Sequence, residues 1–150
     1  HRFETELGVD VITCNTLKEM QAALSPENGR FMLAVVDLNL ADSPKGEVLD
    51  YALQAELPTI VFTATFDFHM RESILKKNVL DYVIKDNDRA IDSIVHSVRR
   101  ILQNRNVRVL VADSLSPESS EAVQMLQAQQ FLVVHANGVQ DALDTATSNW

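Results

Sequence analysis

Short apolar segments alternate along this chain with longer amphipathic segments, and this alternation limits the folds that the chain can adopt. The apolar segments have strand length and span residues 9–14, 31–38, 59–64, 80–84, 107–112 and 131–135. The segments with helical spacing span residues 16–24, 45–55, 68–78, 88–103, 117–130 and 139–146. Strands that alternate with helices of this length predict right-handed βαβ units. We therefore predict an α/β fold with a doubly wound parallel sheet.

Polar residues mark the ends of three successive predicted strands. Asp37 ends one strand, Thr63 ends the next, and Lys85 ends the third. In parallel α/β sheets, binding groups collect at the carboxyl ends of the strands. A carboxylate there can attack a phosphoryl group, while an ammonium and a hydroxyl can stabilise the phosphoryl oxygens. A divalent cation such as Mg²⁺ would complete a site of this kind.

The three strand ends carry motifs that resemble those of response-regulator receiver domains from two-component signalling. The motifs are VVDLNL at residues 35–40, VFTA at 61–64 and DYVIK at 81–85. The resemblance covers residues 9 to about 103, and a second partial match runs from residue 107 to the end. It implies a five-stranded, flavodoxin-like receiver fold followed by the start of a second copy.

The resemblance also implies a role for each site residue. Asp37 would be the phosphoacceptor, Lys85 its ion-pairing lysine, and Thr63 the hydroxyl that moves toward the phosphoryl group. The backbone carbonyl of Asn39 would join Asp37 as a ligand of Mg²⁺, and Tyr82 would be the aromatic residue that rotates on activation. The implied partner is a histidine kinase or a phosphotransfer protein. The implied response is a change in a dimer contact or an output domain, such as a diguanylate cyclase.

The strand–helix pattern restarts after the longest predicted helix. Residues 9–24 resemble residues 131–146 when Asn15 is aligned with Asn137. We predict a first receiver domain at 1–103 that lacks its first strand, a linker at 104–106, and the beginning of a second receiver domain at 107–150. Asp113 matches one acid of the metal-binding pair that the family places after its first strand, and Ala112 replaces the other. The strand before Asp113 either belongs to the second copy alone or inserts beside the strand of Asp37, in the same chain or in a neighbour.

Composition excludes several other classes of protein. The chain has 13 basic and 21 acidic residues and a net charge of −8, which argues against a nucleic-acid-binding surface. No apolar run reaches the length of about 20 residues that a membrane-spanning helix needs. Cys14 is the one cysteine and cannot form a disulfide within the chain, so we expect a reducing cytoplasm.

Two alternatives share parts of the same pattern. A phosphatase of the haloacid-dehalogenase type also uses a strand-end Asp, Thr, Lys and Mg²⁺, but it needs a second Asp where this chain has Asn39. A pseudo-receiver would keep the fold as an interaction module without phosphorylation. Turnover of a phosphate monoester would identify the first, and failure to bind Mg²⁺ would favour the second.

Overall fold

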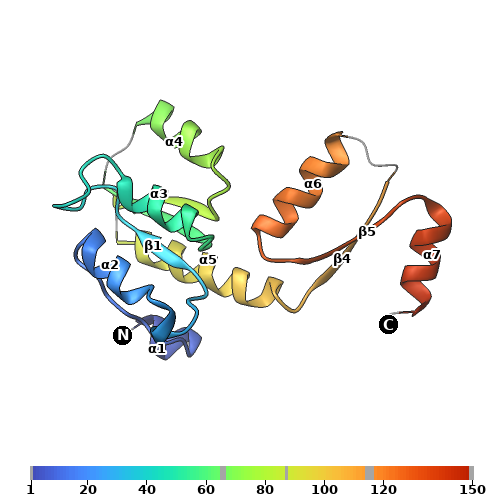
Figure 1. Ribbon diagram of the computed structural model, residues 1–150, viewed down its shortest axis with the longest axis horizontal. Helices are drawn as coiled ribbons and strands as arrows, with labels where there is room; N and C mark the ends of the chain where they lie inside the picture. The colour runs from blue at the N-terminus through green and yellow to red at the C-terminus, as the bar shows by residue number, and fades with distance from the viewer. Residues whose placement is uncertain (1, 65–66, 87, 114–116, 149–150) are drawn as a thin grey trace. The chain divides into compact units, whose positions relative to one another are not determined.

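The chain forms two compact units, each with its own parallel sheet. The computed structural model describes residues 2–64, 67–86, 88–113 and 117–148 (Figure 1). The units are His1–Ser97 and Val98–Trp150, so the division falls within helix α5 (Ala90–Asn104). The domain border expected from the sequence lies a few residues later, after residue 103.

The first unit is built on a three-stranded parallel sheet. Its strands are β1 (Ala34–Val36), β2 (Thr59–Thr63) and β3 (Asp81–Ile84), in the order β1-β2-β3. Helix α3 (Glu47–Gln54) connects β1 to β2, and helix α4 (Phe68–Leu75) connects β2 to β3. Val36, Val61 and Tyr82 lie level with one another in the register of the three strands. The sequence predicted all five of these elements, with differences only at their ends.

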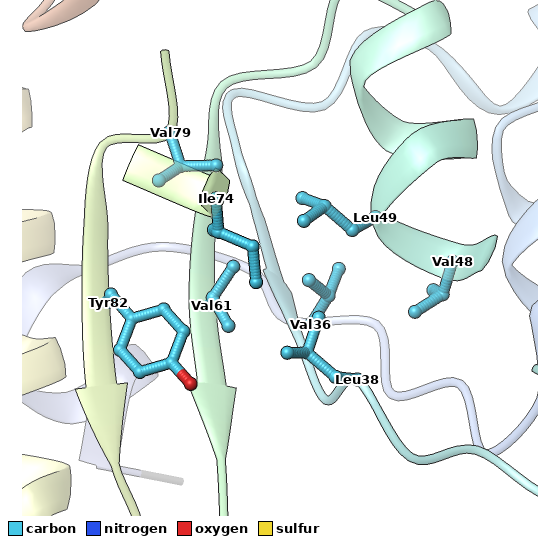
Figure 2. Packing of buried hydrophobic residues seen from close by; sticks show 8 residues of the cluster. All are labelled: Val36, Leu38, Val48, Leu49, Val61, Ile74, Val79 and Tyr82. Atoms are coloured by element: carbon cyan, nitrogen blue, oxygen red, sulfur yellow. The ribbon is translucent and has the colours of Figure 1, made fainter. Parts of the chain in front are cut away.

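Apolar side chains cover both faces of this sheet. On one face, eight buried residues from the strands, α3, α4 and the adjoining loops form the core: Val36, Leu38, Val48, Leu49, Val61, Ile74, Val79 and Tyr82 (Figure 2). On the other face, α5 is joined to the sheet by the Ser97 hydroxyl, which donates to Asp81 Oδ2 at 2.5 Å. Full burial of a side chain such as Val61 contributes about 1.5–3 kcal/mol to folding.

Local hydrogen bonds define where the helices of the first unit begin. Helix α2 (Leu17–Ala23) begins after Thr16, whose hydroxyl accepts from the Glu19 amide at 3.1 Å. One residue earlier, the Asn15 amide donates to the Glu19 carboxylate at 2.6 Å. Asp67 caps α4 by accepting from the Met70 amide at 2.9 Å. Each such cap satisfies an amide that has no partner within its own helix.

The predicted strand at 9–14 is absent, and this part of the prediction is wrong. These residues have no regular secondary structure, and Val11 and Ile12 are exposed. A strand is held by hydrogen bonds to a neighbouring strand, and no strand of the described ranges pairs with this segment. The strands of the described residues therefore do not form one five-stranded sheet: three belong to the first unit and two to the second.

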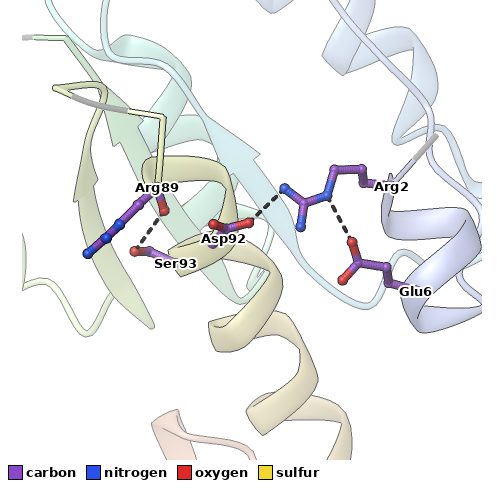
Figure 3. A network of polar contacts seen from close by, with 5 residues as sticks. All are labelled: Arg2, Glu6, Arg89, Asp92 and Ser93. Atoms are coloured by element: carbon purple, nitrogen blue, oxygen red, sulfur yellow. Dashed lines mark hydrogen bonds and ion pairs between the residues drawn. The ribbon is translucent and has the colours of Figure 1, made fainter.

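A short helix that the sequence did not predict, α1 (Arg2–Leu7), precedes this segment. Arg2 pairs with Glu6 of the same helix at 2.8 Å and with Asp92 of α5 at 2.7 Å (Figure 3). All three side chains are exposed, so each pair contributes little to the stability of the fold. A further short element, the 3₁₀ helix η1 (Pro26–Asn28), lies in the predicted loop before β1.

The second unit contains a two-stranded parallel sheet. Strand β4 (Arg108–Ala112) pairs with β5 (Leu132–Ala136), and helices α6 (Pro117–Ala128) and α7 (Val139–Ser148) follow the two strands. The Asn104 side-chain amide, at the end of α5, donates to the Gln129 carbonyl at 2.8 Å. The described part of the chain has no helix with the length and apolar character needed to cross a membrane.

Candidate functional site

The candidate site lies at the carboxyl ends of the three strands of the first unit. Asp37 directly follows β1, Thr63 is the last residue of β2, and Lys85 directly follows β3. Because the strands are parallel and adjacent, these three residues lie at the same edge of the sheet. The structure therefore brings together the strand ends that the sequence identified.

A short ion pair joins Asp37 and Lys85 across the end of the central strand. Lys85 Nζ lies 2.5 Å from Asp37 Oδ2, and the two side chains retain 33% and 29% of their exposure, respectively. The Lys85 amide donates to the Thr63 carbonyl at 2.8 Å, which holds the backbone of Lys85 against β2. The carboxylate is thus accessible to a small phosphodonor, and a cation stands beside it.

The register explains why the two charged groups meet. Side chains alternate between the two faces of a strand, and residues that pair in register share a face. Phe62 pairs with Val83, so Lys85, two residues further on, lies on the same face as Phe62. Asp37 lies on that face too, since it is one residue beyond the Val36–Val61 pair. A shift of one residue in any strand would separate the carboxylate from the ammonium.

Phe62 is a site residue that the sequence reasoning missed. Its ring lies under the ammonium of Lys85, with Nζ 4.8 Å from the ring centroid. Such a cation–π contact contributes about 0.5–1 kcal/mol at an exposed position and restricts where the ammonium can lie. The alternation of β2 carries the signal, because Phe62 is the last residue of that strand on the face of Lys85.

Several hydrogen bonds hold the loop that follows Asp37 in place. The Asn39 amide donates to Asp37 Oδ1 at 3.1 Å, which fixes one carboxylate oxygen while Lys85 holds the other. Further along, Asp42 accepts from the amides of Leu17 and Lys18 at 2.9 and 3.1 Å. These bonds lower the pKa of Asp42, the bond from the Leu17 amide having the largest effect. The loop that begins at the candidate phosphoacceptor is therefore bound to the start of helix α2.

Thr63 and Tyr82 lie on the opposite face of the sheet from the ion pair. Thr63 is fully buried and shares its face with Val61, which pairs with Tyr82 in register. The Tyr82 side chain belongs to the buried core (Figure 2), and its burial raises the pKa of its phenol, with a smaller contribution from Asp67. In this conformation the aromatic ring that the resemblance assigns to switching is packed inside the protein.

Asp113, the remaining predicted site residue, belongs to the second unit. It directly follows β4, and its amide donates to the Ala136 carbonyl of β5 at 3.2 Å. Asp113 and Asp37 occupy equivalent positions, because each is the first residue after the carboxyl end of a parallel strand. The residues directly after Asp113, 114–116, lie outside the described part of the chain.

The residues of the first unit fit a water-rich magnesium site. Mg²⁺ prefers oxygen ligands, and it is commonly held by one or two carboxylates together with waters and phosphate oxygens. Asp37 supplies a carboxylate, and the backbone carbonyl of Asn39 follows two residues later. Groups of three or more His, Cys, Asp or Glu side chains suited to a metal do not occur among the described residues. The carboxylate of Asp37 and the carbonyl of Asn39 are oxygen donors, the kind of ligand that Mg²⁺ prefers.

Comparisons with known proteins give two similar solved structures. Neither the family models nor the curated proteins yield a match. One structure is of a provisionally named two-component system response regulator/GGDEF domain protein, with a TM-score of 0.84 and 30% identity; the alignment covers 97% of this chain and 58% of that one. The second belongs to a protein with the same provisional name, with a TM-score of 0.83, 29% identity, and coverage of 98% and 59%.

These similarities confirm the parallel α/β fold and agree with the receiver resemblance. The chain spans less than two thirds of the length of either neighbour. The comparison therefore concerns the part of those proteins that this chain matches.

Proposed function

We propose that this chain is the receiver part of a two-component response regulator and that Asp37 accepts a phosphoryl group. One observation carries the proposal: the Lys85 ammonium lies 2.5 Å from the Asp37 carboxylate, with Phe62 beneath it and Thr63 at the intervening strand end. A strand-end carboxylate with a fixed cation beside it is suited to hold a phosphoryl group. The names of the two similar structures support the same class of function.

The reaction is a transfer of phosphoryl from a donor histidine to Asp37. A carboxylate oxygen of Asp37 attacks the phosphorus atom, a P–O bond forms, and the P–N bond to the imidazole breaks. The leaving imidazole takes a proton from solvent, and the product on this chain is an acyl phosphate. The Lys85 ammonium then neutralises part of the charge on the phosphoryl oxygens.

Magnesium would be held by Asp37 and by the backbone carbonyl of Asn39. When bound, it would supply positive charge to the oxygens of the incoming phosphoryl group. The amide of Asn39, which donates to Asp37 Oδ1 at 3.1 Å, restricts the orientation of the carboxylate.

We assign the response to Thr63 and Tyr82. Once the phosphoryl group is in place, the Thr63 hydroxyl would donate a hydrogen bond to one of its oxygens. That movement would disturb the buried face of the sheet, where Tyr82 packs with Val61, and would change the packing near α4 and β3. A closely packed core switches between discrete packing arrangements rather than deforming gradually. A small shift at the site can therefore become a larger change at the protein surface.

The proposal also assigns partners and a cellular context. The donor would be a histidine kinase or a phosphotransfer protein in the cytoplasm. The response would reach a dimer contact or an output domain of the GGDEF kind that the similar proteins carry in their names, in line with the diguanylate cyclase output suggested by the sequence. No direct contact with nucleic acid or membrane is part of this function.

Intact mass spectrometry tests the proposal. The protein is incubated with Mg²⁺ and acetyl phosphate, and its mass is compared with that of Asp37→Asn. Asp50→Asn serves as the matched control, because Asp50 is an exposed carboxylate that also pairs with a lysine, Lys77. We expect a single phosphoryl adduct on the wild type and on the control, and none on Asp37→Asn. An adduct that persists in Asp37→Asn would show that another residue is the acceptor.

A further inference from the structure

The exposed carboxylate of Asp42 binds the start of a helix that lies far from it in the sequence. Asp42 Oδ1 accepts from the Leu17 amide at 2.9 Å, and Asp42 Oδ2 accepts from the Lys18 amide at 3.1 Å. These are the first two amides of α2, and no residue of the same helix can pair with them. Asp42 is thus a helix cap that is supplied by the loop between β1 and α3.

The other amides at the start of α2 find partners close by in the sequence. The Thr16 hydroxyl accepts from the Glu19 amide at 3.1 Å, and the Thr16 carbonyl accepts from the Met20 amide at 3.1 Å. The Glu19 carboxylate in turn accepts from the Asn15 amide at 2.6 Å. A helix of seven residues is too short to be stable in water by itself, so α2 depends on its caps and its packing. Asp42 is therefore one of the contacts that determine whether the first turn of α2 forms.

The loop that carries Asp42 also carries the backbone that the proposed function assigns to Mg²⁺. Asn39 lies in the same loop as Asp42, and its amide donates to Asp37 Oδ1 at 3.1 Å. Leu38 and Ser43 are buried and fix the two ends of this stretch, whereas Asn39 and Asp42 lie exposed between them. The bonds from Asp42 to α2 therefore anchor the exposed part of the loop, which includes the backbone of Asn39.

We propose that Asp42 is a positioning residue for the phosphorylation site. By binding the first amides of α2, Asp42 holds the backbone of Asn39 in place beside the Asp37 carboxylate. Asp42 does not itself take part in phosphoryl transfer. Its effect on Mg²⁺ binding rests on the proposed function, whereas its anchoring of the loop does not.

The coupling between the site and α2 acts in both directions, because a coupling free energy between two sites is reciprocal. If the bonds from Asp42 to α2 favour the loop conformation that binds Mg²⁺, bound Mg²⁺ stabilises those bonds. Leu17 and Met20 of α2 pack against the hydrophobic core of the first unit. The first turn of α2 therefore responds to the state of the site through the loop, by a route separate from Thr63 and Tyr82.

Hydrogen exchange measured by NMR on the metal-free protein tests the anchoring of the loop. Asp42→Ala removes both acceptors of the α2 amides, whereas Asp42→Asn removes the charge and keeps one oxygen acceptor. Glu19→Gln is the matched control, because it removes one negative charge beside the same helix turn and leaves the bonds from Asp42 in place. Circular dichroism establishes that each variant is folded.

We expect exchange of the Asn39 amide to accelerate by about threefold or more in Asp42→Ala, and by less in Asp42→Asn. In Glu19→Gln, the Asn39 amide should exchange at the wild-type rate. A variant that only loosened α2 would change exchange within the helix and leave the Asn39 amide unaffected. An Asn39 amide that keeps its wild-type exchange rate in Asp42→Ala would thus overturn the inference.

The Mg²⁺ dependence of phosphorylation tests the consequence for the site. Phosphorylation of Asp37 by acetyl phosphate is followed by intact mass over a series of Mg²⁺ concentrations. We expect the half-saturating Mg²⁺ concentration to rise by about three- to tenfold in Asp42→Ala, with an unchanged maximal rate. The rise should be smaller in Asp42→Asn and absent in Glu19→Gln. In the wild type, Mg²⁺ should also slow hydrogen exchange of the Leu17 and Lys18 amides.

Two outcomes of the Mg²⁺ series would contradict the positioning role. One is a half-saturating concentration that does not change in Asp42→Ala. The other is an equal rise in Asp42→Ala and Asp42→Asn, which would show that only the charge of Asp42 matters. A wild type that is not phosphorylated at Asp37 would instead refute the proposed function, and exchange of the Asn39 amide would then decide by itself whether Asp42 anchors the loop.

Discussion

The ion pair between Asp37 and Lys85 should contribute measurably to stability, and a double-mutant cycle isolates its contribution. The cycle compares the wild type with Asp37→Asn, Lys85→Met and the double variant. The coupling energy is the part of the double variant's change in unfolding free energy that the two single variants do not account for. It reports the contact between the carboxylate and the ammonium rather than the separate effects of the two replacements.

The structure sets the expected magnitude. At 2.5 Å, two unit charges attract by about 2 kcal/mol in a water-like dielectric and by about 7 kcal/mol at an effective dielectric constant of 20. The exposed fractions of 33% for Lys85 and 29% for Asp37 place the pair between the surface and the interior. Fully exposed pairs contribute at most about 1 kcal/mol after solvent and entropy costs. We therefore expect a coupling energy of about 1–2 kcal/mol.

Urea unfolding followed by circular dichroism provides the measurement, and a second ion pair provides the control. Lys77 and Asp50 lie 2.7 Å apart, but their side chains are 44% and 56% exposed. The cycle of Lys77→Met and Asp50→Asn should give a coupling of about 0.5 kcal/mol or less, and added salt should reduce it more strongly. If the coupling energy of Asp37 with Lys85 is no larger than that of Asp50 with Lys77, the view that Asp37 and Lys85 form a fixed pair is refuted.

Three further predictions concern the surroundings of the site and the core. Phe62→Leu removes the ring beneath Lys85 and should lower stability by about 0.5–1 kcal/mol in urea unfolding, together with a slower rate of Asp phosphorylation. The pKa of Asp42 is lowered in the folded protein, so the carboxylate caps α2 fully above the ordinary pKa of 3.8, and the cap is lost as the pH falls through the lower folded pKa. Hydrogen exchange of the Leu17 amide should accelerate over that pH range. In Asp42→Asn, the exchange should respond less to pH. Ile94→Ala leaves a cavity at a fully buried position and should cost about 2–5 kcal/mol of unfolding free energy.

Local pattern predicted most elements of the fold because the buried strands carry strong signals. The apolar run before Asp37 and the run ending at Thr63 both become strands of a parallel sheet, and the long amphipathic segment becomes α5. The same pattern placed Asp37, Thr63 and Lys85 at strand ends, and the receiver resemblance implied the ion pair between Asp37 and Lys85. The specific register added what the sequence did not, which is the ring of Phe62 beneath the ammonium.

The failures arise where structure depends on distant partners. The segment 9–14 has the composition of a strand, but composition cannot supply the neighbouring strand that hydrogen bonding requires. The Asp42 carboxylate caps α2 from a position more than twenty residues along the chain, so no local cap motif could identify it. For Asp113, the strand-end position and a place in the second copy were both predicted, but the sequence left open whether its strand pairs instead with that of Asp37; in the structure it pairs with β5.

Chemical trapping of the phosphorylated residue tests the central claim most directly. The protein is incubated with Mg²⁺ and acetyl phosphate and then reduced with borohydride, which converts an aspartyl phosphate to homoserine. Peptide mapping then locates the modified position. The account predicts homoserine at position 37 and the unmodified residue at every other aspartate. Modification at another aspartate, or none at position 37 under conditions that phosphorylate a known receiver, would contradict it.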